Sequence, residues 1–162
     1  MAELAVTASQ TVQYLTFGLA EQEYGISILQ VQEIKGPSAI TPIPNTPAHV
    51  GGVMNLRGTI IPVINLRQKF GLPPVAVSPF TVIIVVSVGV RVMGLLVDAV
   101  SDVLSVDPGE VQPPPEVAGA GRASFVAGMI IAGEQLVTLL DIERLLDRDL
   151  APGAHVSDGA DI

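Results

Sequence analysis

Side chains that could do chemistry are few and scattered in this sequence. It contains no cysteine, two histidines, eight basic and sixteen acidic residues, with a net charge of −8. The lack of cysteine rules out disulfides, thiolate zinc ligands and cysteine nucleophiles. The basic residues form no cluster, whereas binding to a phosphate backbone needs clustered Lys and Arg, so nucleic acid is not an expected partner. We expect neither a metal nor a cofactor.

Asp98 and Asp102 are the best candidates for acid–base chemistry. On a helical turn their spacing of four residues would bring the carboxylates together, and such a pair could bind a cation or transfer protons. We favour the simpler interpretation that they cap and solvate a turn after a strand. His49, in NTPAHVGG, is interpreted as a surface or capping residue because no second histidine lies near it. We therefore predict no catalytic residue, and an enzyme would need Asp98 and Asp102 as its acid–base pair.

Arg57 and Glu33 are the most informative charged residues. Arg57 is a lone cation in an apolar region, and a semi-buried arginine needs a carboxylate. Glu33, in the segment VQEIKG, is the predicted partner, with its carboxylate within about 6 Å of the guanidinium. The pair could fix two loops or contact a partner protein, and these interpretations are compatible.

The tripeptide Asn-Leu-Arg occurs twice, in two different contexts. The first copy begins at Asn55 and is predicted to form a strand-to-strand turn in which Gly58 supplies a positive φ. The second contains Arg67 and is predicted to lie where a strand passes into a short helix. We expect Arg67 to be structural.

Short apolar runs must position these residues. The chain is 49% hydrophobic, and its sixteen glycines and thirteen prolines fall mostly between such runs. Runs of this length with turn signals between them favour a β-sandwich or barrels. The segment from Phe80 to Val97 contains Arg91 and is mostly valine and isoleucine, so we predict two buried strands with a turn near Gly89 and no membrane helix. The runs predicted as strands are QYLTFGLA, EYGISI, TIIPVINL, TVIIVVSV, VRVMGLLV, SFVAGMIIA and QLVTLL.

Helical signals are brief. Asn65 and Asp141 are suitable N-cap residues for short helices in NLRQKFG and DIERLLD. The start of ILQVQEI is a weaker helix candidate.

An internal repeat organises these elements. YGISILQVQEI from Tyr24 aligns with MGLLVDAVSDV from Met93, and GVMNLRGTIIPVINLRQKF resembles GMIIAGEQLVTLLDIERLL. Each copy of the second pair predicts a strand, a turn, a strand and a short helix. We predict a domain over residues 12–148, with approximate halves 12–72 and 80–148 that are joined near 73–79 and can exchange strands. Residues 1–11 and 149–162 are expected to be disordered.

The motifs around these residues resemble those of the CheW family of bacterial chemotaxis coupling proteins. The resemblance rests on YLTFGLAEQEYGISILQVQEIKG, TPIPNTPAHVGGVMNLRGTIIPVINLRQKFG, GLLVDAVSDVLSV and LVTLLDIERLL. It implies a mainly β fold of two SH3-like five-stranded β-barrels packed on a shared hydrophobic core, with short helices including one near the C-terminus. It also implies a non-enzymatic adaptor that links the cytoplasmic tips of chemoreceptors to the regulatory domain of the histidine kinase CheA. The chain would lie in the cytoplasm, at receptor arrays beneath the inner membrane, without touching the membrane itself.

The resemblance also implies interaction surfaces. Val31 and Val103 would form the apolar wall of the receptor groove, and Gly52 would let a partner backbone come close. A third contact, which closes rings, has no assigned residues. The alternatives are an adaptor in a chemosensory pathway other than chemotaxis, or a small-molecule-binding β-barrel. The residues implied in the receptor-binding groove are Val31, Glu33, Gly52, Arg57 and Val103, and those implied on the kinase-binding surface are Val31, Glu33, Lys35, Gly36, Ile40 and Ile43.

Overall fold

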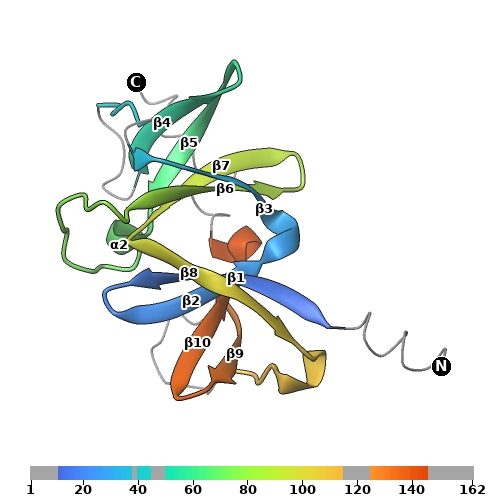
Figure 1. Cartoon of the computed structure of the whole chain (residues 1–162). Helices are drawn as coiled ribbons and strands as arrows, with labels where there is room; N and C mark the ends of the chain where they lie inside the picture. Colours follow the sequence, from blue (N-terminus) through green and yellow to red (C-terminus); the bar gives the residue numbers. More distant parts are fainter. Residues whose placement is uncertain (1–10, 38–39, 45–49, 115–124, 146–162) are drawn as a thin grey trace.

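The computed structural model describes residues 11–37, 40–44, 50–114 and 125–145. The strands in these ranges form two sheets of five strands each, with short helical segments between them (Figure 1). The predicted mainly β fold is therefore confirmed. Apart from Thr11, the termini that we expected to be disordered lie outside the described residues, as does His49.

Each sheet has its own strand order. Sheet A has the order β8-β1-β2-β10-β9, and sheet B has the order β3-β6-β7-β5-β4. Sheet A consists of β1 (Val12–Leu19), β2 (Gln22–Ser27), β8 (Ala99–Val106), β9 (Val126–Ala132) and β10 (Gln135–Leu140). Sheet B consists of β3 (Val31–Lys35), β4 (Val50–Leu56), β5 (Thr59–Asn65), β6 (Val82–Val88) and β7 (Arg91–Val97).

The two sheets do not coincide with the predicted halves 12–72 and 80–148. The first two strands of the chain pair with strands of the second half, and β6 and β7 pair with strands of the first. The segment 73–79 therefore does not join the two barrels, because it connects elements of sheet B. The repeat left open whether the two halves exchange strands, and the structure shows that they do.

The exchange follows the internal repeat strand for strand. The hairpins β4–β5 and β9–β10 are equivalent, and each is flanked by a parallel partner, β7 for β5 and β2 for β10. Isolated bridges Thr41↔Val53 and Gln112↔Met129 then connect the segment after one edge strand to the other edge strand of the same sheet. Both sheets are thus curled toward closure at equivalent positions, as the SH3-like barrels of the predicted fold require.

The core has three parts. The interior of sheet B contains Met54, Ile61, Val63, Ile83 and Val85, among others, and the interior of sheet A contains Val106, Ile130, Val137 and Leu139. The largest cluster lies between the sheets and takes side chains from both, including Leu15, Phe17, Leu19, Ile84, Val86, Met93, Leu95 and Ile142.

The central strands read as continuous apolar runs because each of their faces meets a core. On β6, Ile83 and Val85 point into the barrel, whereas Ile84 and Val86 point into the shared cluster. The side-chain period of two along a strand produces this alternation. β6 and β7 are joined at Gly89, whose φ is 62°, so the predicted pair of strands over 80–97 is confirmed. Within the described residues, no helix is long and apolar enough to cross a membrane.

The short helices sit at the ends of equivalent strands. α2 (Leu66–Lys69) follows β5, and Asn65 Oδ1 accepts a hydrogen bond from Gln68 N at 3.2 Å. Residues 142–145 are helical after β10, where Asp141 Oδ1 accepts from Arg144 N, also at 3.2 Å. Both N-caps satisfy backbone donors that the first helical turn leaves free.

Two weaker helical signals had different outcomes. The start of ILQVQEI is helical as predicted, as the 3-10 turn η1 (Ile28–Gln30), and the rest forms β3. Asp98 and Asp102 do not share a helical turn, because the chain enters β8 directly after Asp98. Backbone pairing of β8 with β1 outweighs the weak helical spacing there.

Candidate functional site

Glu33 and Arg57 join the two edges of sheet B. Glu33 lies on edge strand β3, and Arg57 lies in the turn after the opposite edge strand, β4. Arg57 Nη2 is 2.6 Å from Glu33 Oε2, inside the predicted limit of about 6 Å, and Lys35 Nζ is 3.5 Å from Glu33 Oε1. The hydrogen bond from Arg57 holds the pKa of Glu33 below its ordinary value, although partial burial opposes it.

Arg57 itself is a surface residue, which differs from the semi-buried arginine that we expected. Its side chain is 67% exposed, and its φ of 50° places it in the left-handed region together with Gly58, whose φ is 90°. Asn55 Oδ1 accepts a hydrogen bond from Gly58 N at 2.7 Å. The β4–β5 turn therefore presents the Arg57 guanidinium to solvent while Glu33 orients it.

Gly52 has a structural reason to be glycine. Its φ is 142°, and a Cβ at this position would lie 2.3 Å from Thr41 O. Thr41 belongs to the bridge that helps close sheet B, and Gly52 is buried. The backbone that approaches this glycine in the free protein is thus the chain's own, and a role of Gly52 in admitting a partner stays a prediction. The equivalent Gly128 faces Val111 and Gln112 in the same way.

The other residues implied by the resemblance lie in two regions. Val31 is half-buried at the start of β3 and packs against the shared cluster, whereas Val103 lies on β8 of the other sheet and is 41% exposed. The implied kinase-binding residues run along edge strand β3 and the segment after it. Glu33 and Lys35 are in contact there, Gly36 and Ile43 are exposed, and Ile40 packs against the interior of sheet B.

The chain passes from sheet A to sheet B at η1, which we call the open crossover. Leu29 projects from this turn with 90% of its surface exposed. A cavity of about 220 Å³ adjoins it, lined by Thr11, Val12, Gln13, Tyr14, Ser27, Ile28 and Leu29.

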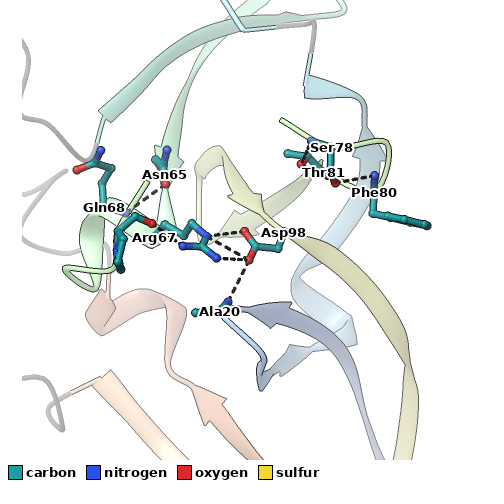
Figure 2. A network of polar contacts seen from close by, with 9 residues as sticks. Ala20, Asn65, Arg67, Gln68, Ser78, Phe80, Thr81 and Asp98 are labelled. Atoms are coloured by element: carbon teal, nitrogen blue, oxygen red, sulfur yellow. Dashed lines mark hydrogen bonds and ion pairs between the residues drawn. The ribbon is translucent and has the colours of Figure 1, made fainter. Parts of the chain in front are cut away.

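The chain returns from sheet B to sheet A at Asp98, which we call the closed crossover (Figure 2). Arg67 Nε lies 2.9 Å and Arg67 Nη2 also 2.9 Å from the two carboxylate oxygens of Asp98. Ala20 N donates to Asp98 Oδ2 at 3.0 Å, and Arg67 Nη1 donates to Pro73 O. Burial acts to raise the pKa of Asp98, but the hydrogen bonds from Arg67 and Ala20 outweigh it and the pKa is lowered.

This geometry removes the basis for an acid–base pair. Asp98 and Asp102 are separated by extended chain, about 13 Å for four residues. The Asp98 carboxylate is held charged by Arg67, and Asp102 Oδ1 accepts from Val103 N at 2.7 Å. In the part of the chain that the structure describes, no group of three or more His, Cys, Asp or Glu side chains could hold a metal ion.

The barrel interiors give no support to a small-molecule site. Each interior carries a cluster of buried apolar side chains. Of the cavities described, one lies at the open crossover and a second, of about 50 Å³, lies beside Arg67 and the segment 74–77. Neither is lined by the fully buried residues of the two barrel interiors.

Comparison with known proteins identifies the family to which this architecture belongs. Residues 13–150 match the CheW-like domain. The chain belongs to the CheW family. A chemotaxis protein CheW from Klebsiella aerogenes is 44% identical, with 92% of this chain and 91% of that protein covered. Protein FrzA of Myxococcus xanthus is 26% identical, covering 88% of this chain and 90% of that one.

A solved CheW structure has the same fold. The scaffolding protein TtCheW of Thermoanaerobacter tengcongensis superposes with a TM-score of 0.78 at 35% identity, covering 85% of this chain and 93% of that one. The CheW-like match includes both sheets, both crossovers and both ion pairs described above. The predicted family and fold are confirmed.

Sequence reasoning missed Leu29 and the pairing of Arg67 with Asp98. The signal was present in the repeat. Aligning Tyr24 with Met93 sets Leu29 opposite Asp98, an apolar residue against an acid at a position where the copies should agree. That mismatch marks the two crossovers as different.

Proposed function

We propose that this chain is a non-enzymatic adaptor that couples the cytoplasmic tips of chemoreceptors to the histidine kinase CheA, in the cytoplasm at receptor arrays. The observation that carries the proposal is its close likeness, over nearly the whole length, to chemotaxis proteins CheW and to a solved CheW scaffolding protein. An adaptor of this kind acts through surfaces alone and needs no reacting side chain.

The open crossover supports a receptor site. A helical hairpin tip binds through apolar anchors that enter a trough with a few polar fixings. Leu29, in η1 between the sheets, and Val103, on β8 of sheet A, are exposed apolar side chains, and the 220 Å³ cavity adjoins Leu29. The Glu33–Arg57 pair, at the edges of sheet B, supplies charged groups that solvent can reach. Such a contact would be moderate in area and reversible, as a signalling assembly needs.

Edge strand β3 supports a kinase surface. It pairs with β6 on one side only, and Ile34 is 45% exposed on it. An edge strand with exposed apolar and charged side chains can add a strand or a flat patch from a partner. We assign the CheA regulatory domain to this edge and the residues that follow it.

Binding measurements with matched valine variants test the proposal. Wild-type protein should bind both a CheA regulatory domain and a soluble chemoreceptor hairpin fragment from the same bacterium. Val103→Asp should weaken receptor binding about tenfold or more, since a charge in an apolar contact is desolvated without a partner. Val90→Asp, at a turn position 99% exposed, is the control and should bind as wild type does.

Two outcomes would contradict it. Wild-type protein that captures neither fragment would end the adaptor proposal. Equal loss of binding in both valine variants would mean that negative charge in general, and not the groove, is responsible.

A further inference from the structure

The contact between Arg67 and Asp98 ties together parts of both sheets. Arg67 lies on α2, directly after strand β5 of sheet B, and Asp98 lies at the passage from β7 to β8. Ala20, whose amide also binds the Asp98 carboxylate, lies in the β1–β2 turn of sheet A. Figure 2 shows the guanidinium and the Ala20 amide converging on the one carboxylate from two elements.

The contact is directional and partly shielded from water. Arg67 is 14% exposed and Asp98 31%, against 67% for Arg57 in the surface pair. Two parallel N–H···O bonds between guanidinium and carboxylate fix both distance and angle. The hydrogen bond to Asp98 raises the pKa of Arg67 and burial opposes it, with a net rise.

The shared cluster between the sheets is made of apolar side chains. Apolar burial holds two surfaces together but is not directional, so by itself it sets the angle between them weakly. A bidentate contact at one margin of that cluster supplies the missing constraint. In Figure 1, α2 and the start of β8 lie at the left margin and η1 at the right, with the helical turn after β10 between them.

The repeat shows that this constraint is one-sided. The positions equivalent to Arg67 and Asp98 hold Glu143 and Leu29. Leucine cannot form an ion pair, and Leu29 is 90% exposed. The closed crossover is therefore held by an ion pair, whereas at the open crossover the equivalent side chain extends into solvent.

We propose that Arg67 and Asp98 are positioning residues that fix the angle between sheets A and B. On the opposite margin, this angle sets how far apart the two sheets lie beside the open crossover. The part of this inference that concerns partner affinity rests on the proposed function. The part that concerns the angle does not, because it is a property of the free protein.

Distances between spin labels test the angle. The chain has no cysteine, so cysteines introduced at Val90, in the β6–β7 turn of sheet B, and at Leu136, on β10 of sheet A, carry labels without competition. Both positions are exposed. In the Asp98→Asn background the 90–136 distance distribution should broaden or shift. Labels at Ile60, on β5, and Val90, in the turn between β6 and β7, both report on sheet B. They form the control pair and should give the wild-type distribution in either background.

The conservative variant separates positioning from mere stability. Arg67→Lys keeps the charge but cannot bind both carboxylate oxygens in parallel, so the 90–136 distribution should lie between wild type and Asp98→Asn. Circular dichroism checks that each variant is folded. Unchanged 90–136 distributions in folded Asp98→Asn and Arg67→Lys would overturn the positioning role.

Affinity for the chemoreceptor hairpin fragment tests the link to the groove. Asp98→Asn should weaken binding about three- to tenfold, although Asp98 lies on the far margin. A broadened 90–136 distance distribution with unchanged affinity would overturn the link between the sheet angle and receptor binding. The role of Arg67 and Asp98 in fixing that angle would still stand. A wild-type protein that binds no fragment would contradict the proposed function, while the label distances would still decide the positioning role.

Discussion

The chain passes between its sheets at two equivalent points, through η1 after β2 and through Asp98 after β7. Strand directions, parallel neighbours and bridging residues agree at both. The side chains do not agree. Leu29 extends into solvent beside a cavity, whereas Asp98 is bound by Arg67 and by the Ala20 amide.

This difference shows how two equivalent parts of one fold can present different surfaces. Backbone pairing and apolar packing reproduce the repeat faithfully, because they depend on periodicity and size. Two differences between the copies, Arg67 against Glu143 and Asp98 against Leu29, then decide whether a margin is held by an ion pair or left exposed. The symmetry of the fold and the difference between its two margins are thus carried by different residues.

Exchanging the residues of the two crossovers should have the largest effect on stability. Asp98→Leu leaves the mostly buried Arg67 guanidinium without its carboxylate, and we expect a loss of about 1–3 kcal/mol, reduced from the fully buried case because Asp98 is one-third exposed. Tm should fall by about 3–9 °C. Urea unfolding followed by circular dichroism measures the change.

The reverse exchange is the matched control. Leu29→Asp alters a side chain that is 90% exposed, so the free energy of unfolding should stay within about 0.5 kcal/mol of wild type. If the two exchanges cost the same, the closed crossover is no more constrained than the open one, and the comparison between them fails.

The framework was predictable from sequence because its signals are local. Continuous apolar runs such as TVIIVVSV, and the caps Asn65 and Asp141, determine their elements almost alone. The strand exchange was not predictable, since the repeat fixes the order of elements but not which copy supplies each neighbour. The β8 strand was missed because its pairing with β1 joins residues more than eighty positions apart.

The candidate site was predictable only in part, for the same reason. The charge pattern predicted that Glu33 and Arg57 form a pair, and they lie together. Whether a charged side chain is buried depends on tertiary neighbours, so the sequence did not reveal that Arg67, and not Arg57, is the mostly buried arginine. The role of Gly52 depended on Thr41, whose approach no local pattern shows.

Acid should reduce the contribution of the closed crossover. The folded protein lowers the pKa of Asp98 from its ordinary 3.8. A lowered carboxyl pKa gives stability that is fully present above the unfolded value and is lost as the pH falls through the folded one. The excess stability of wild type over Asp98→Asn should therefore be constant near neutral pH and shrink below pH 3.8.

Urea unfolding of both proteins between pH 7 and pH 3 measures this difference. Glu33, whose pKa is also lowered, is common to both and cancels. An excess that grew as the pH fell would reverse the sign expected for a charged Asp98 and would contradict the ion pair.

The smallest effect is expected at the surface pair, which sharpens the contrast between the two arginines. Arg57 has a φ of 50°, which costs an L-residue about 1 kcal/mol, and the repeat has Gly133 at the equivalent position with a φ of 63°. Arg57→Gly relieves that strain and removes an ion pair that solvent screens. We expect unfolding stability to stay unchanged or to rise by less than about 1 kcal/mol.

Arg57→Ala isolates the ion pair, because alanine keeps most of the backbone strain and loses the guanidinium. Urea unfolding of the two variants side by side gives the pair's contribution from Arg57→Ala and the strain from the difference. If Arg57→Ala lost as much stability as Asp98→Leu, the Glu33–Arg57 contact would be a structural clamp of sheet B. A small loss of unfolding stability would mean that the fold does not depend on the Arg57 guanidinium. That exposed charge could then contact a partner, as we propose.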